Sequence, residues 1–259
     1  MEKSKLNSLI KRVVSALVLA PLVLGGLLSG WYSFALLVMF ISALLAWEWA
    51  NMVENKNNPV YGMAYFMAAA CAISFANIYY SLAVMVLTMM FVFFKAKEEQ
   101  HRYLLMFGVP YIVLGIASFV WMYVIFGEIT TLWFVLSVWA VDIGGYVVGC
   151  TVKGPKLAPK ISPNKTWSGL FGAMLFSALM SVAVSWYFNR GFYEVFAVLG
   201  VILAVISQMG DLLESKIKRY LGVKDSSNLI PGHGGIFDRI DGLLFAAPFM
   251  LVIFLFFVF

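Results

Sequence analysis

Charged residues are scarce in this sequence. They make up 12% of its 259 residues, whereas hydrophobic residues make up 63%. A soluble domain typically carries about 25% charged residues, so the composition excludes an ordinary soluble globular protein. The scarcity indicates an integral membrane protein, whose length is divided among helical spans rather than soluble domains.

Cysteine is also rare. Cys71 and Cys150 both fall in apolar runs, and they suggest neither a disulfide framework nor a zinc site. Buried free thiols are the expected state. The sequence has no basic run with interleaved aromatic residues, which leaves nucleic acid out of the expected partners. The net charge of +5 is attributed instead to membrane topology and phosphate chemistry.

Long apolar runs fill most of the chain. Because a span needs about 20 apolar residues, the sequence predicts an all-α, polytopic integral membrane protein with about nine transmembrane helices. The predicted spans are Ile10–Leu28, Trp31–Met52, Val60–Asn77, Tyr79–Phe94, Tyr103–Phe126, Thr131–Cys150, Trp167–Asn189, Phe192–Gly210 and Gly242–Phe259. The basic residues before the first run also fit a signal peptide, but the run is long for that role, which favours a retained span.

The positive charges indicate the orientation. With a cytoplasmic N-terminus, 17 of the 18 Lys and Arg residues fall on cytoplasmic segments and Arg190 alone lies outside, as the positive-inside rule requires. Composition suggests a bacterial-type inner (cytoplasmic) membrane. The chain then divides into five N-terminal spans (1–130) and a C-terminal region (131–259) with four spans and two cytoplasmic polar loops, 151–166 and 211–241, which carries nearly all of the polarity that suggests a function.

The loop 211–241 concentrates the charge that the rest of the chain lacks. It holds five of the 13 acids and five of the 18 bases, although a charge near hydrocarbon is energetically costly. Acids suit metal ions, bases suit phosphates, and glycines let a backbone approach a phosphate. The loop therefore predicts a polar reaction site at a membrane face.

The first part of this loop is predicted to continue the eighth span as a helix. At 3.6 residues per turn, Asp211, Glu214, Ser215 and Lys218 share one face. Two interpretations are open: a site that holds a metal ion and a phosphate together, or a solvated helix end with intrahelical ion pairs.

The segment Pro231-Gly232-His233-Gly234-Gly235 cannot form regular helix. Its glycines let backbone N–H groups point into one anion-binding concavity; the alternative is a flexible turn between spans. Asp238 and Asp241 follow at the start of the ninth span, where a helix N-terminus favours carboxylates in any case. Together with Asp211 they would supply oxygen ligands for magnesium, and Arg239 could contact phosphate.

The segment Ser162–Trp167 (Ser-Pro-Asn-Lys-Thr-Trp) predicts a helix start. Ser162 suits the N-cap and Pro163 the first helical position. Free N–H groups and Lys165 at this helix end would form a phosphate site. The alternative is an ordinary helix cap with a lysine that follows the positive-inside rule.

Asp142 lies inside the sixth predicted span, where an acid is by default a functional-site hypothesis. Gly145, Tyr146 and Gly149 share its face, and small residues there allow a close helix or a ligand. Glu48, near the cytoplasmic end of the second span, is a weaker candidate that can simply reach the interface.

These motifs resemble the signature of the phosphatidate cytidylyltransferase family, which runs Ser-x-x-Lys-Arg, then Lys-Asp, then Pro-Gly-His-Gly-Gly-x-x-Asp-Arg-x-Asp. The matching residues are Ser215, Lys218, Arg219, Lys224, Asp225, Pro231 to Gly235, Asp238, Arg239 and Asp241. Asp142-x-Gly144-x-Tyr146 and Ser162–Trp167 match two further landmarks of the family. Ser168 and Ser227 stand where the family often has Glu and Gly.

The resemblance implies transfer of CMP from CTP to phosphatidic acid, which gives CDP-diacylglycerol and pyrophosphate. It implies Mg²⁺, alone or with a second cation, held by Asp211 and Asp238. It also suggests a homodimer that takes its lipid from the bilayer. The expected catalytic residues are Lys165, Ser215, Lys218, Arg219, Lys224, Asp225, His233, Arg239 and Asp241. The expected substrate-binding residues are Asp142, Tyr146, Ser162, Asn164, Gly232, Gly234 and Gly235.

Other functions fit the sequence less well. A CDP-alcohol phosphotransferase also uses Asp-x-x-Asp-Gly, which residues 238–242 mimic, but the two further aspartates of that motif are missing. The alternative from another class is a multi-span ion-coupled transporter with Asp142 as an intramembrane ion site. Transporters tend to have inverted repeats and midplane sites, whereas this sequence has no repeat and its charge lies at one face.

Overall fold

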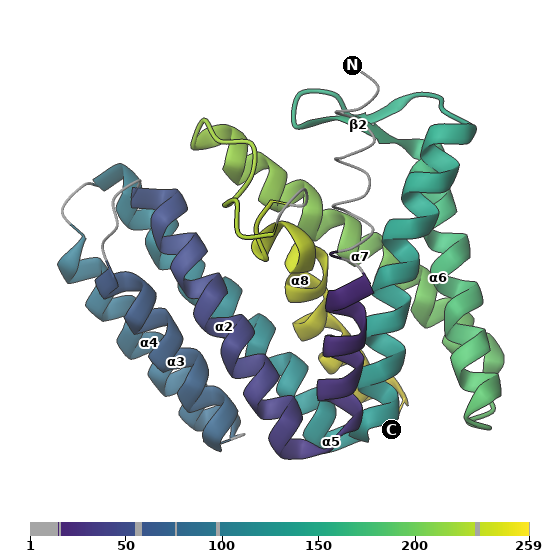
Figure 1. Cartoon of the computed structure of the whole chain (residues 1–259), viewed down its shortest axis with the longest axis horizontal. Helices are drawn as coiled ribbons and strands as arrows, with labels where there is room; N and C mark the ends of the chain where they lie inside the picture. The colour runs from purple at the N-terminus through teal and green to yellow at the C-terminus, as the bar shows by residue number, and fades with distance from the viewer. Residues whose placement is uncertain are drawn as a thin grey trace. The chain divides into compact units, whose positions relative to one another are not determined.

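The structure is a computed structural model that describes residues 15, 17–54, 59–75, 77–96, 99–230 and 234–258. Within these residues the chain is helical apart from its connections and one β-hairpin (Figure 1). A short apolar helix, Leu17–Leu28, comes first. The elements that follow are α2 (Trp31–Glu54), α3 (Pro59–Phe75), α4 (Ile78–Lys95), α5 (Glu99–Thr151), β1 (Lys156–Ala158), β2 (Ser162–Thr166), α6 (Trp167–Tyr187), α7 (Tyr193–Tyr220), α8 (Phe237–Ile253) and a π-helical turn, Phe254–Val258.

Five of the described helices are long and apolar enough to cross a membrane: Trp31–Glu54, His101–Thr151, Trp167–Tyr187, Tyr193–Tyr220 and Phe237–Phe257. The all-α class and the apolar helices of a membrane protein are therefore confirmed, while nine spans and a cytoplasmic N-terminus remain predictions. The fifth and sixth predicted spans form one element, α5, which Gly127 interrupts with a φ of 84° and a ψ of 176°. Glycine accepts this geometry because it has no Cβ.

The chain folds into two compact units. The first comprises residues Met1–Trp121 and Leu221–Ile240, and the second Met122–Tyr220 and Asp241–Phe259. Both α5 and α8 contribute residues to each unit. The predicted division at residue 130 is a single cut along the chain, whereas each compact unit is built from two separate segments.

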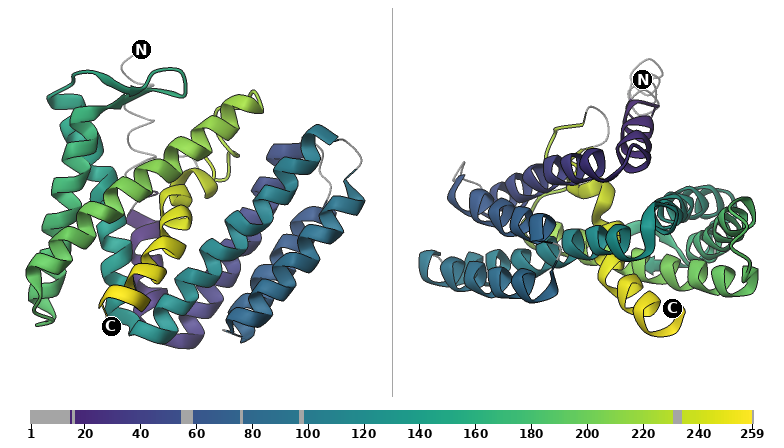
Figure 2. Two further views of the ribbon diagram at one scale, coloured as in Figure 1. Left: turned by 180° about the vertical axis from the view of Figure 1, so that it is seen from behind. Right: turned by 90° about the horizontal axis from the view of Figure 1, so that it is seen from below.

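In the first unit, α2, α3 and α4 lie side by side, as the views in Figures 1 and 2 agree. The hydroxyl of Tyr65 in α3 donates to the carbonyl of Leu105 in α5 at 2.7 Å. An aromatic cluster joins α2, α5 and the start of α8: the Trp49 ring lies 6.0 Å from that of Tyr111 and 5.3 Å from that of Phe237. Such pairs stabilise by about 0.5–1.5 kcal/mol each beyond their buried area. They fix where α8 begins.

In the second unit, small residues let the helix backbones approach closely. A Cβ added at Gly144 of α5 would lie 2.6 Å from the carbonyl oxygen of Gly172 in α6. One added at Gly200 of α7 would lie 2.7 Å from the carbonyl oxygen of Ser177, also in α6. Both contacts are tighter than any side chain allows, so α6 packs directly against its two neighbours, as is typical of small-residue packing between membrane helices.

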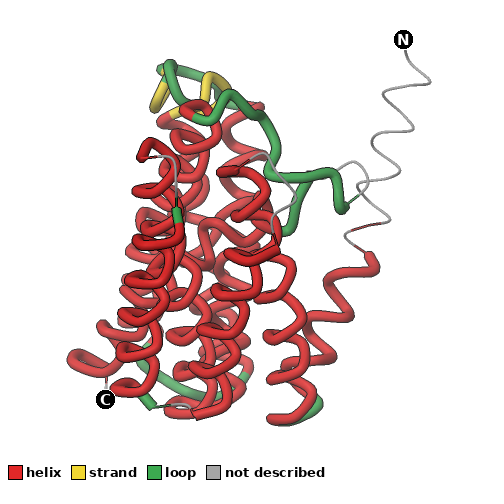
Figure 3. Tube along the Cα trace, turned by 90° about the vertical axis from the view of Figure 1, so that its left-hand side faces the viewer, coloured by secondary structure: helices red, strands yellow, loops and turns green. Residues whose placement is uncertain are grey.

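The structure corrects the predicted helix start at Ser162. Ser162 is not an N-cap and Pro163 is not helical, because both lie in strand β2, which pairs antiparallel with β1. Helix α6 begins at Trp167, and Thr166 is its N-cap, accepting the N–H of Gly169 at 3.1 Å. The fixed φ of proline suits an edge strand as well as a first helical turn, and threonine is also a good N-cap. Figure 3 shows the hairpin at one end of the helices.

Candidate active site

The polar stripe on α7 forms as predicted. Helix α7 continues without a break to Tyr220, and the connection that follows contains Gly222 at a φ of 72°. In its last three turns, Ser215 Oγ donates to Asp211 Oδ1 at 3.4 Å, and Lys218 Nζ lies 2.6 Å from Glu214 Oε2. These i to i+4 pairs confirm that the four residues share one face.

Three carboxylates converge beside this stripe. Oxygen atoms of Asp211, Glu214 and Asp241 all lie within 4.8 Å of one another, and Asp241 reaches the group from α8. Glu214 is only 2% exposed. Carboxylate oxygens at this spacing repel one another unless cations neutralise them, and an all-oxygen set suits a hard cation such as Mg²⁺. The residues present therefore fit a magnesium ion.

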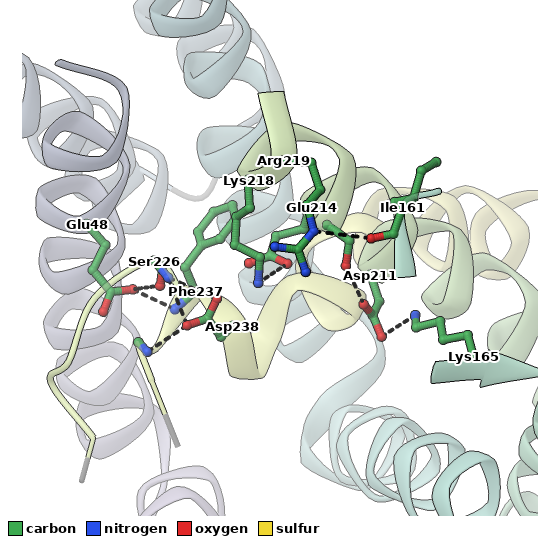
Figure 4. Close-up of polar contacts among 12 residues, drawn as sticks. Glu48, Ile161, Lys165, Asp211, Glu214, Lys218, Arg219, Ser226, Phe237 and Asp238 are labelled. Carbon is green, nitrogen blue, oxygen red and sulfur yellow. Dashed lines mark hydrogen bonds and ion pairs between the residues drawn. The ribbon is translucent and has the colours of Figure 1, made fainter. Parts of the chain in front are cut away.

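The β-hairpin contacts α7 beside these acids. Lys165, on β2, forms an ion pair with Asp211 (Figure 4). The Nε of Arg219, near the end of α7, lies 3.4 Å from the carbonyl oxygen of Ile161 in the hairpin. The hairpin is thus attached to α7 at two points. Lys165 reaches the acidic group from a strand, although the sequence placed it on a helix end.

Asp142 is an exposed acid near this group. It lies on α5, and its charge interacts with that of Asp241. Tyr146, one turn further along α5, is 73% exposed. The predicted roles of both residues in substrate binding remain predictions.

A second polar cluster lies in the first unit, around the start of α8. Asp238 accepts the backbone N–H of Gly235 at 2.7 Å and that of Ser226 at 3.0 Å. Ile230 and Gly234 exchange two backbone hydrogen bonds, of 2.8 and 3.2 Å, which close the glycine loop. Gly234 has a φ of 87°, and a Cβ there would lie 2.6 Å from Asp238 Oδ2, so both the backbone and the space require glycine.

Gly234 and Gly235, the described residues of this loop, lie outside helix, and their N–H groups have partners within the protein. The N–H of Gly234 donates to Ile230 and that of Gly235 to Asp238. A phosphate bound to either N–H would replace one of these bonds. Gly232 and His233 lie outside the described residues, and their predicted roles stay predictions.

Glu48 belongs to this second cluster, although the sequence predicted it only as a weak candidate for a functional site. It is fully buried, rather than reaching an interface. Its carboxylate accepts hydrogen bonds from Ile236, Phe237, Ser226 and Ser227. The available signal was an acid in the run Trp47-Glu48-Trp49 within an apolar helix, since a buried charge is retained only where it has partners.

A family model described as "Cytidylyltransferase family" matches residues 10–257. The chain belongs to the cytidylyltransferase family. It is 35% identical over 261 residues to the phosphatidate cytidylyltransferase of Pseudomonas aeruginosa, covering 92% of this chain and 94% of the relative. It is 31% identical over 253 residues to that of Rickettsia felis, covering 93% and 90%. The resemblance inferred from the signature residues is confirmed.

A third relative matches over a shorter region. The phosphatidate cytidylyltransferase of Brucella suis is 42% identical over 133 residues, which are 48% of this chain and 46% of the relative. This match therefore spans about half the length of the Brucella relative. Membership of the cytidylyltransferase family gives no support to the alternative function of an ion-coupled transporter.

The other site residues expected of a cytidylyltransferase are spread over both units. Lys165, Ser215, Lys218, Asp211 and Asp241 come together in the second unit. Glu214 joins them; the sequence placed it on the same helix face but not among the expected catalytic or metal residues. Asp238, Gly234 and Gly235 lie in the first unit, so the joint metal role of Asp211 and Asp238 remains a prediction. The expected residues at the surface are Asn164, Arg219, Lys224, Asp225 and Arg239.

Proposed function

We propose that this protein is a phosphatidate cytidylyltransferase. A phosphate oxygen of phosphatidic acid attacks the α-phosphorus of CTP and forms the new P–O–P bond. The bond from the α-phosphorus to the bridging oxygen breaks, and pyrophosphate leaves with its electron pair. The observation that carries the proposal is the group of Asp211, Glu214 and Asp241 with two paired lysines, in a chain whose relatives bear this name.

The charges of this group suit the meeting of two polyanions. The three carboxylates exceed Lys165 and Lys218 by one negative charge, which would repel phosphates. A divalent cation reverses that sign, and Asp211, Glu214 and Asp241 are the residues that would hold it. When bound, Mg²⁺ supplies charge neutralisation and alignment of phosphate oxygens.

The protein's own groups then position the substrates. Lys165 and Lys218 already lie beside the acids and can donate to phosphate oxygens, and Arg219 stands one residue further along α7. The lipid phosphate is already ionised at neutral pH, so the reaction needs no dedicated general base. Most of the rate enhancement comes from holding two phosphates in line. Whether Asp238 adds a metal ligand is a separate part of the proposal.

The proposal includes a position in the cell. The apolar helices and the bacterial relatives support a multi-pass protein of the inner membrane. The distribution of Lys and Arg supports nine spans, a cytoplasmic N-terminus and a cytoplasmic active site. The lipid enters from the bilayer with its tails still in the membrane. The homodimer rests on the family resemblance.

The test uses purified protein in detergent with CTP, phosphatidic acid and Mg²⁺, and measures pyrophosphate and CDP-lipid together. Asp211→Ala and Asp241→Ala are expected to lose at least about 100-fold in kcat, as does removal of a preorganised charge-stabilising group, and EDTA abolishes the activity. Glu194→Gln is the matched control, because Glu194 is an exposed acid in the first turn of α7. Absence of pyrophosphate with every nucleoside triphosphate and lipid phosphate tried refutes the proposal.

A further inference from the structure

Glu48 of α2 is a fully buried carboxylate with an ordered set of donors. Its Oε1 accepts the N–H of Ile236 at 2.9 Å and the hydroxyl of Ser227, and its Oε2 accepts the N–H of Phe237 at 2.7 Å and the hydroxyl of Ser226 at 3.3 Å. Each oxygen therefore binds one backbone amide and one hydroxyl. Figure 4 shows this carboxylate pointing at the start of α8.

These contacts replace the usual cap of a helix. The first N–H groups of a helix have no intrahelical acceptor, and a Ser, Thr, Asp or Asn next to them in sequence normally supplies one. Here the acceptor comes from a helix 188 residues earlier. The negative carboxylate also suits the positive end of the helix dipole. The start of α8 is thus fixed from α2.

The same carboxylate explains one glycine of the loop. A Cβ added at Gly235 would overlap Ser226 Oγ and would lie 2.5 Å from Glu48 Oε1. Gly235 is itself buried. The requirement for glycine at this position therefore comes from the close approach of both Ser226 and Glu48.

Apolar packing reinforces the polar contacts. Trp49, the next residue of α2, packs its ring 5.3 Å from that of Phe237. Ser226 is shared between two acids, because its hydroxyl donates to Glu48 and its N–H donates to Asp238. Glu48 and Asp238 together bind both sides of the loop. The described residues that flank the loop are thus fixed relative to α2.

We propose that Glu48 is a positioning residue for nucleotidyl transfer, which holds the residues on both sides of the glycine loop, and Asp238 at the start of α8, in their working geometry. The inference rests on the proposed function for the role of the loop. Ser227, which stands where the family often has Gly, adds a donor to Glu48 and strengthens the same link. This role needs both oxygens of the carboxylate as acceptors, because a Gln in its place would turn an NH₂ group toward one of the two backbone N–H donors.

The first measurement does not depend on activity. Hydrogen–deuterium exchange over residues 226–240 is compared between the parent and Glu48→Gln. Loss of the hydrogen bonds to a charged acceptor is expected to speed amide exchange in this segment at least about tenfold. The exchange rates in α3 are expected to stay unchanged. Glu54→Gln is the matched control, the same substitution in the same helix. Unchanged exchange in Glu48→Gln overturns the inference.

The second measurement separates positioning from general stability. In Glu48→Gln, kcat is expected to fall at least about tenfold, with a KM for CTP that changes less. Ser227→Ala alone is expected to lower kcat about threefold. The double variant, Glu48→Gln with Ser227→Ala, is expected to have the kcat of Glu48→Gln, because the hydroxyl acts through Glu48. The inference is overturned if the two substitutions lower kcat independently in the double variant, or if a variant with fast amide exchange keeps a normal kcat.

Two further outcomes have definite meanings. If Glu48→Gln does not fold, Ser226→Ala with Ser227→Ala removes the two hydroxyls and leaves the carboxylate in place. That variant is expected to show the faster exchange and the lower kcat in milder form, and normal values for both overturn the inference. If the parent itself makes no CDP-lipid, the proposed function fails, and the exchange measurement still decides whether Glu48 holds the loop.

Discussion

Replacing Asp241 with Asn is expected to stabilise the metal-free protein while abolishing its activity. Asp241 lies in a group with Asp211 and Glu214 whose oxygen atoms are all within 4.8 Å. Asn keeps the size of the side chain and removes its charge. The change therefore removes part of the repulsion among the three carboxylates.

The structure sets the magnitude. Two like charges 4.8 Å apart repel by about 3.5 kcal/mol at an effective dielectric constant of 20. The Asp211 side chain is 34% exposed and paired with Lys165, and Glu214 is paired with Lys218, so solvent and counter-ions reduce this repulsion. A net stabilisation of about 1–2 kcal/mol remains, which corresponds to about 2–8 °C in the unfolding midpoint of a chain of this size.

The assay is thermal unfolding in detergent, with EDTA and with increasing Mg²⁺. The parent should gain about 2.7 kcal/mol when free Mg²⁺ reaches 100 times its dissociation constant, and Asp241→Asn should gain much less. In EDTA the variant should unfold at a higher temperature than the parent. A lower midpoint in EDTA, or an equal response to Mg²⁺, refutes the reasoning. Glu194→Gln should behave as the parent in both conditions.

Three other substitutions test separate parts of the structure. Gly235→Ala should lower the unfolding midpoint by the equivalent of about 1–3 kcal/mol and reduce CTP turnover, whereas Gly25→Ala, where an added Cβ meets nothing within 4 Å, should do neither. Lys165→Met should raise the KM for CTP about tenfold, and Lys156→Met, on the exposed part of the hairpin, should leave it unchanged; equal effects would contradict the role of Lys165. Gly200→Val should separate α6 from α7 and lower the midpoint by more than Gly235→Ala does, since its Cβ meets backbone; an unchanged midpoint would contradict this packing.

The sequence predicted the local features of the site well. The stripe from Asp211 to Lys218 depends only on helical periodicity and on the absence of a helix breaker, and both hold in the structure. The error at Ser162 has a local cause, because Ser162 and Thr166 are both acceptable caps and proline fits a strand edge. Pairing with β1 decided between them, and that pairing cannot be read from one cap motif.

The non-local features could not be predicted from one sequence. Helical spacing allowed Asp238 and Asp241 to share a face, yet Asp238 accepts from Ser226 and Gly235 while Asp241 joins Asp211. Their different partners depend on how the loop before α8 closes. The role of Glu48 depends on a contact between residues nearly 190 positions apart.

The distance along the chain between Glu48 and its donors has a consequence for biogenesis. During synthesis Glu48 is made 188 residues before Ile236 and 189 residues before Phe237. Until then α2 carries a carboxylate whose native partners do not yet exist, and burying it alone in an apolar environment is strongly unfavourable. The N-terminal helices are therefore expected to reach their final packing only after residues 226–237 have been made, and a chain truncated before residue 226 should be a ready substrate for membrane proteases.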